Sequence, residues 1–489
     1  MTPLSKSTYL MGLQCPKLLW HRYHAKELLQ QPGTLAQAIF DQGHEVGAWA
    51  KRLFPAGSEI APGVTDFDLV CAETQRQLLT RQPLFEPGFR AGGGYARIDI
   101  LNPVDDDAWD LIEVKSSTRV KDVYLADVAF QAYVCTAAGL TIRRCYVLHI
   151  NSSYVRQGDV DPQVLFTQVD VTRKVVALSA QIADKVDAFA RVVGAAEHPA
   201  VNIGPHCNSP YACPLTYRCW AFLPEHHVMT LSRGTKKGFQ LLAQGISAIT
   251  DLPETARLSR VQSIQKRAVV TNEPQIDAKQ IKAFLGRLHY PLHYLDFETM
   301  GSAVPFFDGS RPFEQIPFQF SLHLVRHPGA EPEHRSFLAE GREDPRPRLM
   351  AALVQAIEPT GSIIAYNAPF EWGVLTGCAN ELPQHAVWVK SLQPRIIDLL
   401  EPFRKVHCYH PDQHGSASIK AVLPAFTGKD YSQLAIGEGG TASLEFVRVT
   451  FTEVSAQERA KVRRQLEEYC QLDTLAMVWL VEKLQELAD

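Results

Sequence analysis

The sequence predicts an α/β protein of several domains, and three observations support this class. The chain has 489 residues, more than one hydrophobic core usually organises, so two or three domains are expected. Hydrophobic residues make up 46% and charged residues 21%, which is typical of folded globular proteins rather than disordered or fibrous ones. Patterns typical of strands and amphipathic helices occur in two separate regions, before residue 195 and again from about residue 290.

The charge balance and the termini limit the possible functions. Lys and Arg total 49 and Asp and Glu total 53, a formal net charge of −4, so no overall positive field attracts nucleic acid. The N-terminus lacks the basic-then-apolar order of a signal peptide, and no apolar run approaches the roughly 18 residues that span a bilayer. We therefore expect a soluble cytoplasmic protein without a membrane partner. Its ten cysteines are then expected to be reduced thiols or metal ligands rather than disulfides.

The predicted organisation has three parts, which are residues 1–225, a helical linker module over 226–288, and residues 289–489. The predicted elements of the first part, in chain order, are helices within 5–55, a β-hairpin over 95–115, a helix over about 122–138, a strand over about 142–150, and one long amphipathic helix over 171–195.

The cysteines are distributed unevenly. Cys207, Cys213 and Cys219 fall within thirteen residues that are rich in turn formers, which predicts a loop folded around a bound group. Cys15, which precedes a proline at the end of a helix-like opening segment, is the best candidate for a fourth thiolate. The six others stand singly among apolar neighbours and are expected to be buried, inert thiols; they are Cys71, Cys135, Cys145, Cys378, Cys408 and Cys470.

A first group of charged residues lies on the predicted hairpin. Glu113 and Lys115 are two apart on a strand and therefore face the same side, and Asp99 on the neighbouring segment can complete the group. Two carboxylates can hold a divalent cation, and an adjacent ammonium can lower the pKa of an attacking water and stabilise charge on a phosphate. A surface salt bridge on a hairpin is the alternative for so short a pattern.

The pattern Asp99…Glu113-Val114-Lys115 resembles the core of the restriction-endonuclease-like superfamily. The resemblance implies a PD-(D/E)XK nuclease domain with an α/β core, in which Asp99, Glu113 and Lys115 are catalytic residues and the two acids bind Mg²⁺ or Mn²⁺.

Two further residues match the RecB-like branch of that superfamily. His44, in Gln-Gly-His-Glu-Val-Gly, matches its helix-borne metal-binding histidine. Gln131, in Ala-Phe-Gln-Ala-Tyr-Val, matches the catalytic glutamine that follows the catalytic strand. The sequence departs from the branch four residues later, where Cys135 replaces the expected tyrosine and Tyr133 stands two residues after the glutamine.

One cysteine before this core and three after it resemble the arrangement in RecB-like nucleases that carry iron–sulfur clusters, including AddB-type and CRISPR-associated nucleases. The resemblance implies that Cys15, Cys207, Cys213 and Cys219 hold a [4Fe–4S] cluster, which fastens the N-terminal helix to the end of the domain. Four thiolates can also hold zinc, although the five-residue gaps match neither paired C-x-x-C zinc knuckles nor the ferredoxin run.

A second group of acids lies in the last part of the chain. Asp296 and Glu298 alternate with apolar residues, which places both carboxylates on one face of a strand. Glu371 follows another apolar strand, and Tyr469 and Asp473 are four apart on one helical face. Side-by-side carboxylates are unfavourable unless a cation neutralises them, so this group predicts a metal site.

These residues together resemble the three exonuclease motifs of the DnaQ-like (DEDD) family, over about residues 290–487. The resemblance implies a ribonuclease H-like α/β fold and two divalent cations about 4 Å apart, bound by Asp296, Glu298, Glu371 and Asp473. Tyr469 would orient the attacking water or help to deprotonate it, as in the tyrosine subclass. The second motif usually ends in Asp, and Glu371 is longer by one methylene.

The sequence thus predicts a nuclease with two separate metal-dependent sites, which hydrolyses DNA with single-stranded ends in repair, foreign-DNA degradation or phage defence. An RNA-processing exonuclease and a nucleic-acid-binding scaffold with inactive sites are the alternatives. Three basic stretches are candidate phosphate contacts, although each is also typical of a solvated helix face; they are Arg233–Lys237, Arg257–Arg267 and Arg459–Arg464.

Overall fold

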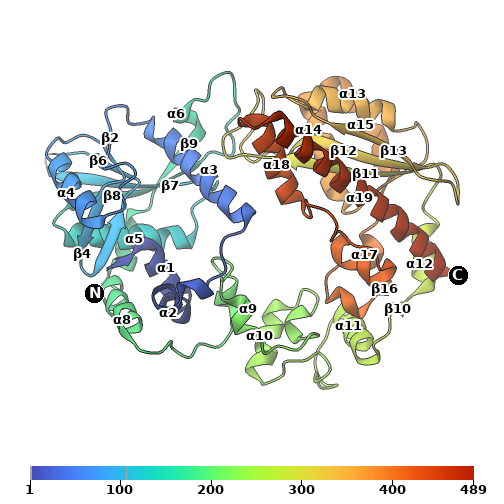
Figure 1. Ribbon diagram of the computed structural model, residues 1–489, viewed down its shortest axis with the longest axis horizontal. Helices are drawn as coiled ribbons and strands as arrows, with labels where there is room; N and C mark the ends of the chain where they lie inside the picture. The colour runs from blue at the N-terminus through green and yellow to red at the C-terminus, as the bar shows by residue number, and fades with distance from the viewer. Residues whose placement is uncertain (1–2, 106) are drawn as a thin grey trace. The chain divides into compact units, whose positions relative to one another are not determined.

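The computed structural model describes residues 3–105 and 107–489, and the chain divides into two compact units (Figure 1). The first unit comprises Met1–Ala221 and Ser302–Phe313, and the second comprises Phe222–Gly301 and Glu314–Asp489. Each unit combines helices with a mixed sheet, so the chain is an α/β multidomain protein, as predicted. Within the described residues, the helices are all too short or too polar to cross a membrane.

A six-stranded mixed sheet with the order β2-β3-β6-β7-β8-β9 forms the centre of the first unit. The predicted hairpin is present as the antiparallel pair β6 and β7, and the predicted helix α5 connects β7 to the parallel strand β8. The strands are β2 (Ser58–Glu59), β3 (Leu84–Phe85), β6 (Ile100–Pro103), β7 (Ala108–Lys115), β8 (Thr141–Ile150) and β9 (Phe166–Asp170). A smaller sheet contains β1 (Leu4–Ser5), β5 (Gly94–Arg97) and β4 (Gly88–Ala91).

Helices cover both faces of the central sheet of the first unit (Figure 1). Leu111 of β7 belongs to the apolar cluster that includes Phe130 of α5 (Asp122–Ala137), and Ile112 belongs to the cluster that includes Val46 of α3 (Thr34–Lys51). Alternate residues of β7 therefore face opposite helices, and Glu113 lies on the α5 side. Further helices of this unit are α1 (Lys6–Gln14), α2 (Pro16–His24), α4 (Phe67–Leu78), α6 (Pro162–Leu165) and α9 (Thr216–Cys219).

The helix predicted over 171–195 is two helices, α7 (Thr172–Ser179) and α8 (Ile182–Gly194), so the prediction of one long helix was wrong. The break at residues 180–181 allows Val175 on α7 and Val186 on α8 to pack into the same core from two directions. A continuous periodic pattern does not distinguish these two arrangements.

Residues 302–313 follow a strand of the second unit in sequence but pack within the first unit. Ala303 and Val304 join an apolar cluster with Tyr154 and Leu165, and the Arg156 guanidinium donates at 2.9 Å to the carbonyl of Pro305. The sequence patterns did not predict this segment's position.

The second unit contains a five-stranded mixed sheet with the order β13-β12-β11-β14-β15. β11 pairs antiparallel with β12 and parallel with β14. The strands are β11 (Leu292–Met300), β12 (Ile316–Val325), β13 (Glu333–Leu338), β14 (Ser362–Ala365) and β15 (Ile396–Asp398). The helices that follow β12 are α13 (Arg346–Ala356), α14 (Ala368–Glu381), α15 (Ala386–Leu392), α16 (Glu401–Arg404), α17 (Ile419–Thr427), α18 (Gly439–Phe451) and α19 (Ala456–Ala488).

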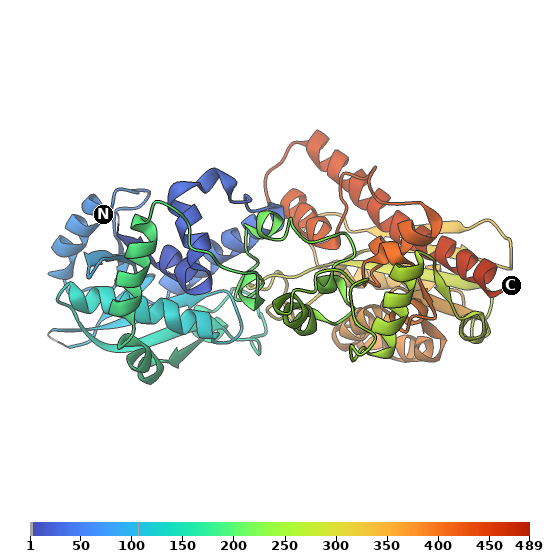
Figure 2. The ribbon, with the colours of Figure 1, turned by 90° about the horizontal axis from the view of Figure 1, so that it is seen from below.

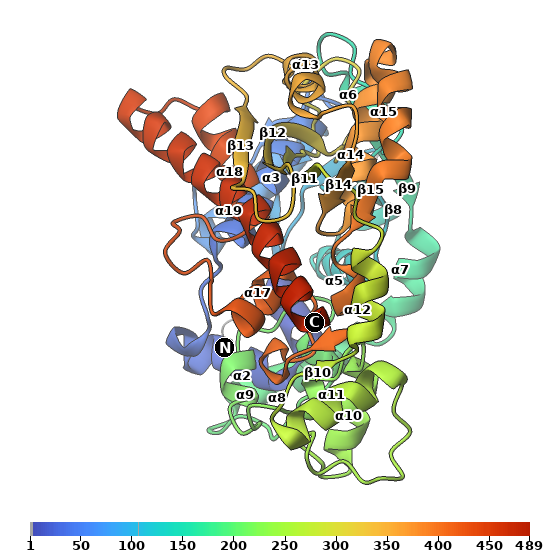
Figure 3. The same cartoon turned by 90° about the vertical axis from the view of Figure 1, so that its right-hand side faces the viewer.

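The alternation of β11 separates an apolar face from an acidic one. Leu295 and Phe297 pack with α13, α14 and α15, whereas Asp296 contacts α19 through Cys470. Figures 2 and 3 show the long helix α19 running across the face of this sheet opposite α13. The acids of β11 therefore lie between the sheet and a helix that carries further polar groups.

The segment predicted as a helical linker belongs to the second unit and contains α10 (Thr235–Ala243), α11 (Arg260–Thr271) and α12 (Ala278–Leu285). It has an apolar cluster of its own around Val228, Leu241 and Ile249. The short strand β10 (Gln275–Ile276) pairs with β16 (Cys408–Tyr409), which joins this segment to the later part of the unit.

Candidate active sites

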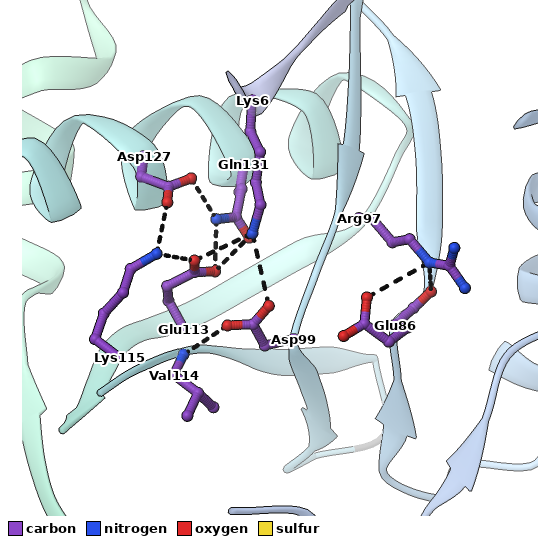
Figure 4. Close-up of polar contacts among 9 residues, drawn as sticks. All are labelled: Lys6, Glu86, Arg97, Asp99, Glu113, Val114, Lys115, Asp127 and Gln131. Carbon is purple, nitrogen blue, oxygen red and sulfur yellow. Dashed lines mark hydrogen bonds and ion pairs between the residues drawn. The ribbon is translucent and has the colours of Figure 1, made fainter. Parts of the chain in front are cut away.

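The first candidate site lies at the end of β7, where the structure brings together Asp99, Glu113, Lys115 and Gln131 (Figure 4). Glu113 is fully buried, and its two carboxylate oxygens accept from the Lys115 ammonium at 2.5 Å and from the Gln131 side-chain amide at 2.7 Å. Asp99 lies in the bend between β5 and β6 and accepts from the backbone N–H of Val114 at 2.7 Å. These four predicted residues therefore form one polar cluster on the α5 side of the sheet.

Two residues that the sequence did not single out, Lys6 and Asp127, complete this cluster (Figure 4). The Lys6 ammonium lies 3.1 Å from Glu113 Oε1 and 3.6 Å from Asp99 Oδ1. Asp127 accepts from Lys115 at 2.9 Å and from Gln131 at 2.8 Å. The spacing of four between Asp127 and Gln131 on a helix could have revealed Asp127. Lys6 is 107 positions from Glu113, and no local pattern indicates it.

The ammonium groups control ionisation in this site. Burial opposes the charged form of Glu113, but Lys115 and Lys6 outweigh it and hold the pKa of Glu113 below its ordinary value. Burial and the neighbouring Glu113 raise the pKa of Asp99 to about 7. Burial also opposes the charged form of Lys115, yet Glu113 and Asp127 raise its pKa. Lys115 is therefore a fixed positive charge rather than a proton acceptor in the metal-free site.

The structure places His44 apart from these contacts. Its side chain is exposed on α3, the helix that covers the opposite face of the sheet through Val46 and Ala50. Among the described residues, no hydrogen bond or ion pair joins His44 to Asp99 or Glu113. Its role as a metal ligand therefore stays a prediction.

The four cysteines of the predicted cluster line one pocket. Cys15 ends α1 and precedes α2, and the side-chain amide of Gln14 donates at 2.8 Å to the carbonyl of His206 beside Cys207. Burial raises the pKa of Cys213 to about 11, and the other three thiols add to this shift. The N-terminal helices and the loop around residues 207–219 thus meet at the pocket that the four cysteine side chains line.

The spacing of these thiols bears on whether they could share one metal ion. Among the described residues, no three of the four sulfur atoms lie within 4.8 Å of one another. A Zn–S bond is about 2.3 Å long, so sulfurs that share one zinc ion lie at most about 4.6 Å apart. A single zinc ion bound by all four thiolates would therefore require these cysteines to move closer together.

The second candidate site lies where β11, α14 and α19 meet, and it brings together Asp296, Glu298, Glu371 and Asp473. Ligand atoms of Asp296, Glu298 and Cys470 all lie within 4.8 Å of one another. Glu371 is buried in the first turn of α14, and its Oε2 atom has no hydrogen-bond partner among the described residues. An unpartnered buried carboxylate oxygen close to other acids is suited to a cation.

The acids of this site repel one another. Burial first, then Asp473 and Glu298, raise the pKa of Asp296 well above its ordinary value. Burial and neighbouring acids raise the pKa of Glu298 to about 8, although Lys420 opposes the shift, and burial with Asp398 and Asp473 raises that of Glu371 to about 8. Without a cation, these carboxyl groups therefore retain protons near neutral pH.

Two tyrosines lie beside Asp473. Tyr431 donates to Asp473 Oδ1 at 2.6 Å, and Tyr469, one helical turn before Asp473, also hydrogen-bonds to that carboxylate. Burial raises the pKa of Asp473 to about 6 even though both hydroxyls oppose this shift. Tyr469 was predicted from the spacing of four on α19, but Tyr431 lies 42 positions away from Asp473 in a loop and has no such pattern.

Two further charged residues, Asp398 and Lys420, lie near these acids. Asp398 accepts from the backbone N–H of Asn367 at 3.1 Å and of Ala368 at 3.4 Å, which fixes the start of the helix that carries Glu371. The Lys420 ammonium lies 5.4 Å from the centre of the Tyr469 ring, so it adds a positive charge at the edge of this site.

Other expectations about side chains need adjustment. Cys470 was expected to be surrounded by apolar residues, but its thiol lies 3.6 Å from Asp296 Oδ2, because it shares the sheet-facing side of α19 with Asp473.

Some side chains of the predicted basic stretches donate hydrogen bonds to carbonyl groups of the protein itself. Arg463 donates to the carbonyl of Ala339 at 2.6 Å, and Lys266 donates to that of Leu252 at 2.6 Å.

Comparison with known proteins gives two similarities. A family described as a domain of unknown function (DUF2779) matches residues 293–418, which include Asp296, Glu298 and Glu371 but not Asp473. The chain is also 27% identical over 260 residues to a protein of Mycoplasma pneumoniae described as "Uncharacterized protein MG366 homolog". That similarity covers 48% of this chain and 38% of the relative, so the chain spans well under half of the relative's length.

Proposed function

We propose that this protein is a metal-dependent nuclease with two sites, one in each unit, that hydrolyse phosphodiester bonds of DNA. The observation that supports this most is the convergence of four buried or half-buried carboxylates, Asp296, Glu298, Glu371 and Asp473, with one lysine at their edge. Such a group is unfavourable unless cations or protons neutralise it.

In the second unit, the four acids would hold Mg²⁺ or Mn²⁺. Bound divalent cations supply an acidified water and neutralise charge on the reacting phosphate. Burial and the neighbouring acids raise the pKa of Tyr469, so it would orient the water as a hydrogen-bonding group. The resemblance to DnaQ-like exonucleases implies release of nucleotides in the 3′→5′ direction.

In the first unit, Asp99 and Glu113 would hold the divalent cation, with Lys115 as the neighbouring fixed charge. The ammonium of Lys115 can stabilise negative charge on a phosphate, because Glu113 and Asp127 keep it protonated. Gln131 hydrogen-bonds to both Glu113 and Asp127, so it positions the carboxylates rather than the substrate.

End-labelled single-stranded DNA and RNA, incubated with Mg²⁺ or Mn²⁺, test the proposal. We expect an Asp99→Ala, Lys115→Ala double variant to retain a 3′→5′ ladder on 5′-labelled DNA, which a 3′ block or a further Asp473→Ala change removes. Glu467→Ala, at an exposed position of the same helix, is the matched control. A ladder on RNA alone would make the protein a ribonuclease. No cleavage of either polymer with both metals would leave a nucleic-acid-binding scaffold.

We further propose that Cys15, Cys207, Cys213 and Cys219 bind a [4Fe–4S] cluster that joins the N-terminal helices to the loop over 207–219. The pocket that all four cysteines line supports this assignment. Anaerobically purified protein is expected to be brown, with about four iron atoms per chain. Cys207→Ser should lose the iron, whereas Cys71→Ser, outside the pocket, should keep it. Stoichiometric zinc without iron would contradict the assignment.

A further inference from the structure

Lys6 is the first residue of α1, and its ammonium lies between the two carboxylates proposed to bind metal in the first unit (Figure 4). It is 3.1 Å from Glu113 Oε1, 3.4 Å from Glu113 Oε2 and 3.6 Å from Asp99 Oδ1. Lys115 contacts Glu113 but reaches toward Asp127 on its other side. Lys6 is therefore the ammonium that bridges Asp99 and Glu113.

Other donors also contact these carboxylates. Asp99 Oδ2 accepts from the Val114 backbone N–H, and Glu113 Oε2 accepts from Gln131. Each of these is a fixed donor on the protein framework. Lys115 also donates to Glu113 Oε1. A cation that bridges Asp99 Oδ1 and Glu113 Oε1 would use the oxygens that Lys6 contacts.

The position of Lys6 is fixed by the fold rather than by a freely moving chain. Ser5 caps α1 by accepting from the backbone N–H of Thr8, and Leu4 and Ser5 pair with β5 as strand β1. The Tyr9 ring stacks on Phe130 of α5 with a centroid separation of 4.5 Å. The helix that carries Lys6 is thereby fixed against the same helix, α5, that carries Gln131.

We propose that Lys6 is a resident counter-ion of the first site, whose ammonium a divalent cation must displace in order to bind Asp99 and Glu113. The inference rests on the proposed function of this site and adds a residue that sets its affinity for metal. Three carboxylates, Asp99, Glu113 and Asp127, share two ammonium groups here. Removal of the Lys6 charge would strengthen the attraction of the site for a dication.

The first test measures Mn²⁺ affinity by calorimetry, on the full chain with Asp296→Asn and Asp473→Asn to weaken metal binding in the second site. Lys6→Met is expected to bind Mn²⁺ at the first site at least about tenfold more tightly than its parent. Lys6→Arg, which keeps the charge, should stay close to the parent. Lys174→Met removes an exposed lysine of the same unit and is the matched control.

The outcomes separate this inference from the proposed function. Equal or weaker Mn²⁺ binding by folded Lys6→Met would overturn the counter-ion role alone. Absence of Mn²⁺ binding that depends on Asp99, in the parent and in every variant, would overturn the proposed metal site and the counter-ion role with it.

A second measurement needs no substitution at Lys6. Displacement by Mn²⁺ should expose the Lys6 amine. The rate at which Lys6 is acetylated should therefore rise severalfold when Mn²⁺ is added. Mass spectrometry of the chain without substitutions measures this rate. Lys174 should be acetylated at the same rate with and without Mn²⁺. An unchanged or slower rate at Lys6, under conditions where Mn²⁺ binds, would contradict displacement.

Discussion

The two acidic sites neutralise their carboxylates in different ways. In the first unit, Asp99, Glu113 and Asp127 are interleaved with Lys6 and Lys115, and Glu113 is held ionised. In the second unit, four carboxylates face one another with Lys420 at the edge, and their pKa values are raised. The first site therefore has internal counter-ions, whereas the second depends on protons or added cations. Loss of one acid should consequently affect the two units differently.

The largest expected effect is on activity in the second unit. Asp296→Asn should lower the Mn²⁺-dependent shortening of 5′-labelled DNA by at least about a thousandfold, because it removes a carboxylate central to the group. The assay uses Asp99→Ala, Lys115→Ala protein, so that the first site does not contribute. Glu467→Ala should leave the rate unchanged. A rate within tenfold of the parent in Asp296→Asn would contradict the assignment.

The second prediction is that loss of one acid changes the free energy of unfolding of the two units in opposite directions. Glu113→Gln should destabilise the metal-free first unit by roughly 3–5 kcal/mol, because it leaves Lys6 and Lys115 with fewer partners near a buried position. Asp296→Asn should instead raise the free energy of unfolding of the metal-free second unit, because one member of a repelling group is removed. Hydrogen exchange in EDTA, followed in peptides from β7 and β11, measures both. Destabilisation of both units would remove the distinction between the sites.

The third prediction separates the two tyrosines beside Asp473. Tyr469→Phe should reduce the exonuclease rate by about tenfold to a hundredfold without abolishing it, because water orientation is impaired while the metal ligands remain. Tyr431→Phe loses the 2.6 Å hydrogen bond to Asp473 and should mainly raise the Mn²⁺ concentration needed for half-maximal rate. Rates measured across a Mn²⁺ titration distinguish them. Equal behaviour of the two variants would show that Tyr469 only supports Asp473.

The smallest expected effect is a pH dependence. The pKa values of Glu298 and Glu371 are raised on folding from 4.5 to about 8, so the folded protein binds more protons than the unfolded chain between these values. The contribution of these groups to metal-free stability therefore falls as pH rises from 4.5 to 8. Binding of Mn²⁺ at pH 8 should release protons from the second site, because Glu298 and Glu371 are still partly protonated there.

Calorimetry in buffers of different ionisation enthalpy measures this proton release, with Asp99→Asn to weaken metal binding in the first site. Glu298→Gln should release fewer protons than its parent. Binding without proton release at pH 8 would mean that the carboxyl groups of the second site are already ionised when metal-free.

The sequence predicted the placement of site residues correctly where they share one strand or helix, because side chains on such an element recur with a fixed spacing. The alternation of β11 placed Asp296 and Glu298 on one face, and the hairpin β6–β7 and helix α5 were predicted close to their observed positions. Glu113 and Lys115 were likewise expected to share one face of a strand, whereas Gln131 was assigned from the family resemblance.

The residues that were missed reach their sites through long-range packing. Lys6 depends on the packing of α1 against β5 and α5, and Tyr431 depends on a loop that returns to α19. The break between α7 and α8 falls inside a continuous apolar period, so periodicity alone could not locate it. Local patterns identify side chains that share one element, whereas partners from distant elements become visible only when the fold is known.

The packing of residues 302–313 within the first unit has a consequence for synthesis on the ribosome. Ala303 and Val304 complete an apolar cluster with Tyr154 and Leu165, yet they are translated more than a hundred residues later. Domains generally fold as units while the chain emerges from its N-terminal end. Here the nascent first unit cannot complete its core until β11 and the segment after it have emerged, so part of its apolar surface stays exposed until then. A fragment that ends at residue 225 would carry that uncovered apolar surface permanently.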